Sequence, residues 1–271
     1  MGDMKEDLIN QIVSNFGSLN DMITDIVSLV SQTPKGFSES IYGTMEAIAN
    51  AIVPIAIVLA VLFFVIELCN KSVMMEIVSW EVAAKLLLKL ILAKVMIQSS
   101  FWLLEAVFAY IVDIMGIVGT ATLSIPAFDE SVVRNEINGM GLFALLGFLV
   151  STVPLNLILT VVKWVIQVIV YGRMIELYIL FAISPLPIAT LAGEGVHDVA
   201  KKFFQNFVAV SLQGVIIVIA VGVFAGFIGD VIALAGDSTM ALLSNYILMT
   251  LILALVLFKS GSWAKQVVGL M

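Results

Sequence analysis

The chain has 271 residues, of which 61% are hydrophobic and 12% are charged, and its formal net charge is −7. A soluble domain is about half apolar and about a quarter charged, so this composition excludes a soluble fold and predicts a protein whose solvent is the bilayer. The negative charge gathers near the N-terminus, and there is no basic patch of the kind that binds nucleic acid tightly. The single cysteine, Cys69, excludes an internal disulfide and a cysteine metal cluster, and we expect no cofactor.

The N-terminal segment alternates apolar and polar residues at helical spacing. Residues 5–30 place leucines, isoleucines and valines on one face, which predicts an amphipathic helix too polar to span a membrane. The turn-rich stretch SQTPKGFSES (31–40) follows it. We therefore predict an extracytoplasmic amphipathic helical tail at residues 1–46 and a transmembrane domain at residues 47–271.

Long apolar runs fill that domain, with polar loops between them. Each run has about the ~20 residues that cross a bilayer as a helix, or more. The predicted fold class is an all-α, polytopic membrane protein with about five spans, at 47–68, 86–112, 142–171, 203–228 and 241–258.

A polar stripe interrupts the second of these spans. Lys94, Gln98 and Glu105 fall within about 40° of one another on a continuous helix. A charge at the bilayer centre costs ~2.5–3.5 kcal/mol on insertion scales, so this stripe should not face lipid. We expect it to line a conduit or a contact between subunits.

The run at 174–190 is apolar but contains two prolines, Pro185 and Pro187. Proline lacks an N–H, so the carbonyls of Phe181 and Ile183 should lose their helical partners. Irregular backbone at membrane depth survives only against protein or water. We predict a re-entrant segment whose tip includes Ser184, Pro185 and Pro187; the alternative is a kinked sixth span.

Loop charges favour the re-entrant path. With five spans, Lys71, Arg173, Lys201, Lys202 and Lys259 all lie on one side, as the positive-inside rule requires. Six spans would place the last three of these outside. We therefore predict a multi-pass protein of the cytoplasmic membrane, with its N-terminus outside and its C-terminus in the cytoplasm.

Other polar residues have two interpretations each. Asn206 and Gln213 share a face of the fourth span, where they either bond within one bundle or line a conduit. Arg173 and Glu176 are either interfacial anchors or, with Lys201 and Lys202, a docking point for a cytoplasmic partner. His197, the one histidine, is interpreted as a solvated loop residue.

Sequence motifs for catalysis are missing from the chain. It contains no HExxH, GxSxG, Walker A or dinucleotide fingerprint, and the stretch GFIGD (226–230) departs from the intramembrane aspartyl protease signature. We expect that the protein is not an enzyme and has no catalytic or metal-binding residues.

The stretch RMIELYILFAISPLPIATLAGEGVHDVAKKFFQNFVAVSLQGVIIVI (173–219) carries a resemblance. Its arginine before an apolar run, its S-P-L-P-I-A motif and its Lys201–Lys202 pair resemble the TrbL-type polytopic membrane subunit of conjugative type IV secretion systems, which is related to the VirB-type inner-membrane channel protein. Beyond those residues the likeness lies in the layout of the spans, and the long hydrophilic C-terminal extension of some relatives is missing.

The resemblance implies a scaffold or conduit subunit that assembles as a ring-like homo-oligomer in the phospholipid membrane. Its implied partners are secretion ATPases, bitopic membrane subunits and a transient single-stranded DNA–relaxase substrate. The alternative function is a secondary transporter or channel with a midplane site at the broken helix. A transporter should contain a second, matching interrupted segment.

Overall fold

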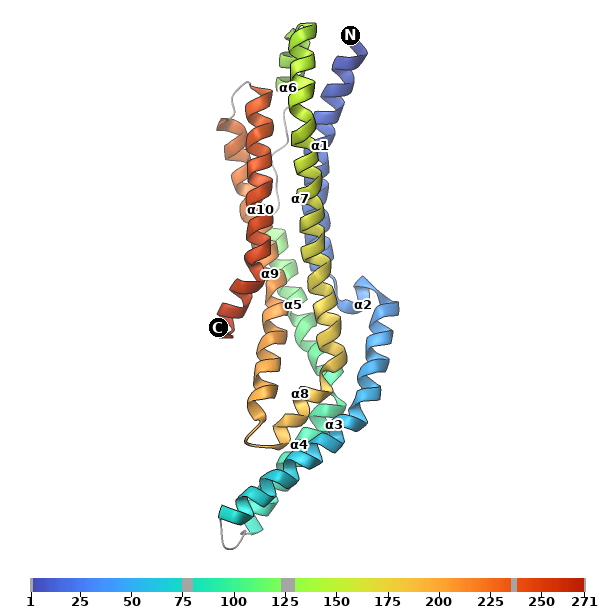
Figure 1. Ribbon diagram of the computed structural model, residues 1–271, viewed down its shortest axis with the longest axis vertical. Helices are drawn as coiled ribbons and strands as arrows, with labels where there is room; N and C mark the ends of the chain where they lie inside the picture. Colours follow the sequence, from blue (N-terminus) through green and yellow to red (C-terminus); the bar gives the residue numbers. More distant parts are fainter. Residues whose placement is uncertain (1, 75–79, 123–129, 235–237, 271) are drawn as a thin grey trace. The chain divides into compact units, whose positions relative to one another are not determined.

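The computed structural model describes residues 2–74, 80–122, 130–234 and 238–270. Every regular element within them is helical, which confirms the predicted all-α class (Figure 1). The elements in chain order are α1 Gly2–Val30, α2 Pro34–Phe37, α3 Glu39–Met74, α4 Trp80–Gln98, α5 Ser100–Thr122, α6 Glu130–Gly139, α7 Leu142–Ile183, α8 Pro185–Ala189, the 3-10 turn η1 Thr190–Ala192, α9 His197–Leu234 and α10 Thr239–Val267.

Among the described residues, five helices are long and apolar enough to cross a membrane, as predicted. They cover Glu39–Ser72, Ser100–Gly119, Leu142–Ile183, His197–Asp230 and Thr239–Val267. The second differs from the predicted span at 86–112, because a break at Ser99 separates α4 from α5. The charged half of the predicted helix forms α4, and the more apolar half forms α5.

α7 does not end near Tyr171, where we predicted the third span to end. It continues as one helix of 42 residues to Ile183, so the interruption begins at Ser184. At about 1.5 Å per residue such a helix is about 63 Å long, roughly twice the ~30 Å hydrocarbon core. The re-entry of 174–190 into the bilayer stays a prediction.

The chain forms two compact units, and each is described by itself. Unit 1 comprises Met1–Ser31, Ile114–Tyr171 and Gly214–Ser260, and unit 2 comprises Gln32–Asp113, Gly172–Gln213 and Gly261–Met271. The long helices α7 and α9 each contribute residues to both units.

In unit 1, α1 is part of the packed core. Its apolar face, including Leu8, Ile12 and Ile23, is buried. Its polar groups contact neighbouring helices: Asn15 Nδ2 donates to Asn156 Oδ1 of α7 at 2.5 Å, and the Tyr246 hydroxyl of α10 donates to the Asn15 carbonyl at 3.2 Å. The amphipathic helix is therefore confirmed but is packed into unit 1; its extracytoplasmic side stays a prediction.

Unit 2 has an aromatic core between α5, α7 and α9. The Phe181 ring contacts Phe101 in a tilted arrangement and Phe207 edge-to-face, with ring centroids 5.3 Å and 5.5 Å apart. Aromatic pairs at such spacing stabilise a core beyond the area that they bury. This cluster fixes the end of α7, from which the broken segment continues.

Candidate functional site

The broken segment packs against α3 and α4 in unit 2. The short helix α8 and the turn η1 pack against both of these helices (Figure 1). Most of the buried residues at this contact are small, which lets the backbones approach closely. The buried contact residues are Ala56, Ala60, Ala93, Ile97, Ile188, Ala189 and Ala192.

The two prolines set the geometry of the break. Pro185 occupies the first turn of α8, where its missing N–H costs nothing. The Phe181 carbonyl, which Pro185 cannot serve, accepts the Ser184 N–H at 3.4 Å instead. Ser184 is fully buried, and its hydroxyl has no hydrogen-bond partner within the described ranges.

The Thr190 hydroxyl closes the segment on its other side. It donates to the Pro187 carbonyl at 2.7 Å and accepts the Ala200 N–H at 3.1 Å. One side chain thus bonds the Pro187 carbonyl, which also accepts the Thr190 N–H, and an N–H group in the first turn of α9. The Thr190 side chain therefore links α8 to the start of α9.

Four charged side chains surround the turn between η1 and α9; we call them the Glu67 cluster. Glu67 of α3 is 6% exposed, and its Oε2 accepts the Glu194 N–H at 2.5 Å. Lys71 Nζ lies 3.5 Å from Glu67 Oε1 and 3.0 Å from Glu194 Oε1. Lys89 of α4 lies 3.6 Å and 3.9 Å from the same two carboxylates.

This cluster is balanced in charge and joins three parts of unit 2. The two ammonium groups offset the two carboxylates, so the nearly buried Glu67 is not left unpaired. The hydrogen bond from Lys71 lowers the pKa of the Glu194 carboxyl below its ordinary value. Beside the cluster, Phe63, Ile66, Asn70 and Val196 help to line a cavity of about 300 Å³.

Arg173 lies inside unit 2 and not on its surface. The side chain is 2% exposed, and its guanidinium donates to the carbonyls of Val210 and Ser211 at 3.1 Å and 3.3 Å. It also lies 5.6 Å from the Phe108 ring centroid, a cation–π distance. The docking interpretation of Arg173 is therefore replaced by a structural one, because the buried guanidinium binds α9.

The predicted stripe of Lys94, Gln98 and Glu105 is not continuous. The break at Ser99 lies between the first two residues, which belong to α4, and the third, which belongs to α5. Lys94 and Gln98 are exposed on α4, while Glu105 is half-buried on α5 and hydrogen-bonds Tyr42. The subunit-contact prediction therefore stays open for α4, whereas Glu105 has a partner within its own chain.

The remaining predicted residues lie on or near α9. Asn206 and Gln213 are both half-buried, and the Gln213 amide packs against Gly261, where an added Cβ would lie 3.4 Å from its nitrogen. Lys201 and Lys202 are exposed, as a docking role requires, and Glu176 is half-buried. His197 is also exposed, with its ring near the Glu194 carbonyl and Asp198.

The sequence interpretation did not bring the Glu67 cluster together. Its members come from residues 67–71, 89 and 194, and only the packing of α8 against α3 and α4 makes them neighbours. A signal was present: acidic and basic residues occur at the ends of three apolar segments. Their pairing depends on an inter-helix register that periodicity does not encode.

Together these features define a polytopic helical membrane protein whose most constrained region is a broken helix docked in a helical hairpin. Within the described residues, no group of three or more His, Cys, Asp and Glu is placed to hold a metal ion. The family model described as "TrbL/VirB6 plasmid conjugal transfer like protein" matches residues 19–185, well over half of the chain. The chain belongs to this family.

The family match ends at Pro185. It therefore overlaps the stretch 173–219, on which the sequence resemblance rested, at residues 173–185. It also covers the C-terminal part of α1, where the sequence interpretation relied on hydrophobic periodicity alone. A search of curated proteins and a search of solved structures each found no match.

Proposed function

We propose that the chain is a membrane-embedded scaffold or conduit subunit of a conjugative type IV secretion system. It assists the transfer of a DNA–relaxase or protein substrate across the cytoplasmic membrane. The family match over residues 19–185, on a chain with five membrane-length helices, is the observation that carries this proposal. The role is structural and not catalytic.

The proposed orientation is N-terminus outside and C-terminus in the cytoplasm. It is supported by the basic residues Lys71, Lys201, Lys202 and Lys259, which a five-span path gathers on one side. In this orientation the Glu67 cluster and the exposed Lys201–Lys202 pair face the cytoplasm. They are therefore available to the secretion ATPases and the bitopic subunits.

A ring-like homo-oligomer is the proposed assembly. Exposed Lys94 and Gln98 lie on α4 among the exposed apolar side chains Leu87, Leu88 and Ile91. A lysine on such a surface is costly against lipid, so contact with a second copy or with water is favoured. Transient single-stranded DNA would pass through the assembly without tight binding.

The transporter alternative is less well supported. Pro54 and Pro154 lie inside the continuous helices α3 and α7, so neither creates a second break like that at Ser184. A transporter built on two matching interrupted helices needs such a partner segment.

A deletion and complementation experiment tests the proposal. Deleting the gene from a donor cell should abolish conjugative transfer, and the wild-type chain should restore it. The Lys94→Leu variant should accumulate in the membrane and bind fewer copies of itself in mild detergent, with Lys85→Leu, another exposed lysine of α4, as the control. Normal transfer from the deletion strain would refute the proposed function.

A further inference from the structure

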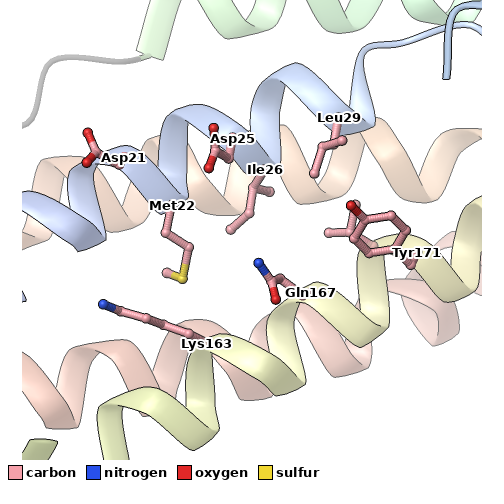
Figure 2. A pocket seen from close by; sticks show the side chains of 9 residues that line it. Asp21, Met22, Asp25, Ile26, Leu29, Lys163, Gln167 and Tyr171 are labelled. Carbon is pink, nitrogen blue, oxygen red and sulfur yellow. The ribbon is translucent and has the colours of Figure 1, made fainter.

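A cavity lies between α1 and α7 inside unit 1 (Figure 2). Its volume is about 460 Å³, within the range of cavities that hold small ligands. Residues of opposite charge and several apolar residues line it together. The proposed secretion role makes no use of this cavity.

The α7 side of the cavity is a row of hydrogen-bond donors. Lys163, Gln167 and Tyr171 follow one another at intervals of four residues, so they share one face of the helix. Figure 2 shows Lys163 and Gln167 directed from α7 toward the α1 side. An ammonium, an amide and a phenol in a row match the acceptor oxygens of a phosphate group.

The α1 side carries acceptors of the opposite charge. Asp21 and Asp25 lie one helical turn apart, and Asp21 interacts electrostatically with Lys163. The apolar side chains of Met22 and Ile26 lie beside them (Figure 2). A ligand that complements both helices therefore has an ammonium next to a phosphate, together with an apolar part.

The place of Lys163 along α7 suits the edge of a bilayer. Trp164, which comes next, is 66% exposed, and tryptophan is enriched at the membrane interface. The cavity would thus lie at the depth of lipid headgroups.

We propose that this cavity binds a phosphate–ammonium zwitterion, the headgroup of a phosphatidylethanolamine-type phospholipid. The phosphate accepts hydrogen bonds from Lys163, Gln167 and Tyr171, and the primary ammonium donates to Asp21 and Asp25. The proposal does not depend on the secretion function.

The two carboxylates give the site its selectivity. A primary ammonium has three N–H donors, whereas the quaternary ammonium of phosphatidylcholine has none. Phosphatidylglycerol has no cation and would leave Asp21 and Asp25 facing a net negative lipid. Phosphatidylethanolamine should therefore bind more tightly than either of the other two.

Native mass spectrometry of the purified full chain tests this order with three lipids of identical acyl chains. We expect phosphatidylethanolamine to bind about tenfold more tightly than phosphatidylcholine or phosphatidylglycerol, the effect of about one charge-assisted hydrogen bond. The double variant Asp21→Asn, Asp25→Asn should lose this preference. The matched control Asp3→Asn, Asp7→Asn, on the same helix but away from the cavity, should keep it.

Lys163→Gln should weaken binding of all three lipids, while Lys259→Gln, an exposed lysine of the same unit, should not. Competition by soluble phosphoethanolamine distinguishes a site for the free zwitterion from one that also requires the acyl chains. Displacement of the lipid at equal concentration would overturn the lipid assignment.

Crosslinking in the membrane gives a second measurement that does not depend on the stability of the variants. A benzophenone amino acid at Leu29, which lines the cavity, should capture phosphatidylethanolamine, whereas the same probe at exposed Thr24 should not. Equal binding of the three lipids, a preference for phosphatidylglycerol, or unchanged selectivity in the double aspartate variant would each overturn the proposal.

Discussion

At the scale of single residues, Glu67 is the carboxylate on which the docking of the broken segment depends. It accepts the Glu194 N–H and faces Lys71 and Lys89 while only 6% exposed. Glutamine keeps its shape but loses its charge. The two lysines would then face a neutral amide, with Glu194 as their remaining carboxylate partner.

We expect Glu67→Gln to destabilise the chain by about 1–3 kcal/mol, less than the ~3–5 kcal/mol of a fully buried pair because both lysines are 30% exposed. Thermal unfolding in detergent measures the change as a lower Tm. Glu46→Gln, an exposed position on the same helix, is the control and should leave the Tm unchanged. Equal effects at the two positions would contradict a special role for Glu67.

Gly193 allows the turn to lie directly against α3. An added Cβ would lie 3.0 Å from Val196 Cγ2 and 3.3 Å from Phe63 Cβ. We expect Gly193→Ala to cost about 1–3 kcal/mol through overpacking and to lower the Tm. In Gly195→Ala, where an added Cβ meets nothing within 4 Å, the Tm should stay that of the wild type.

The Glu194 carboxyl makes the stability of this turn dependent on pH. Because Lys71 lowers its folded-state pKa, its contribution is present above the unfolded pKa of about 4.3 and is lost as the pH falls through the folded value. The Tm of wild type should therefore exceed that of Glu194→Gln at pH 7, and the difference should vanish on acidification below pH ~4. A difference that persists at low pH would contradict the ion-pair explanation.

At the scale of elements, the break at Ser184 ends α7 and lets the short helix α8 pack against both α3 and α4. Ile188 and Ala189 reach α3 and α4 because α7 stops at Ile183. Alanine at both prolines restores two N–H donors and favours a continuous helix, since proline costs ~3 kcal/mol in a helix interior. A continuous α7 would withdraw these residues from α3 and α4.

We expect Pro185→Ala with Pro187→Ala to insert at normal levels and to fail in conjugative transfer. Immunoblotting of membranes and transfer frequency measure the two effects, and Pro54→Ala, within continuous α3, serves as the control. Normal transfer by the double variant would mean that the break is a tolerated irregularity.

At the scale of the whole molecule, the membrane topology decides which segments face the cytoplasm and which face the outside. We expect cysteines introduced at Ser38 and Ser262, in a Cys69→Ala background, to react from opposite sides of the membrane with an impermeant thiol reagent. Cysteines at Glu194 and Lys201 should react from the cytoplasmic side together with Ser262. Labelling of Ser38 and Ser262 from the same side would refute the five-span path.

The all-helical membrane class was determined by composition alone, because 61% hydrophobic residues leave the bilayer as the only suitable solvent. The prolines likewise located the break near Ser184, since a missing N–H acts within a few residues. The missing N–H of proline and the fraction of hydrophobic residues are both properties of the linear chain.

Tertiary structure decided the rest. Arg173 looked like a surface anchor, but it is buried because α9 supplies two carbonyls for its guanidinium. α1 looked like a tail, but it packs into unit 1, and Lys71 meets Glu194 only because α8 packs against α3 and α4. Each of these outcomes depends on contacts between residues far apart in the chain, whose register follows from side-chain packing and not from periodicity.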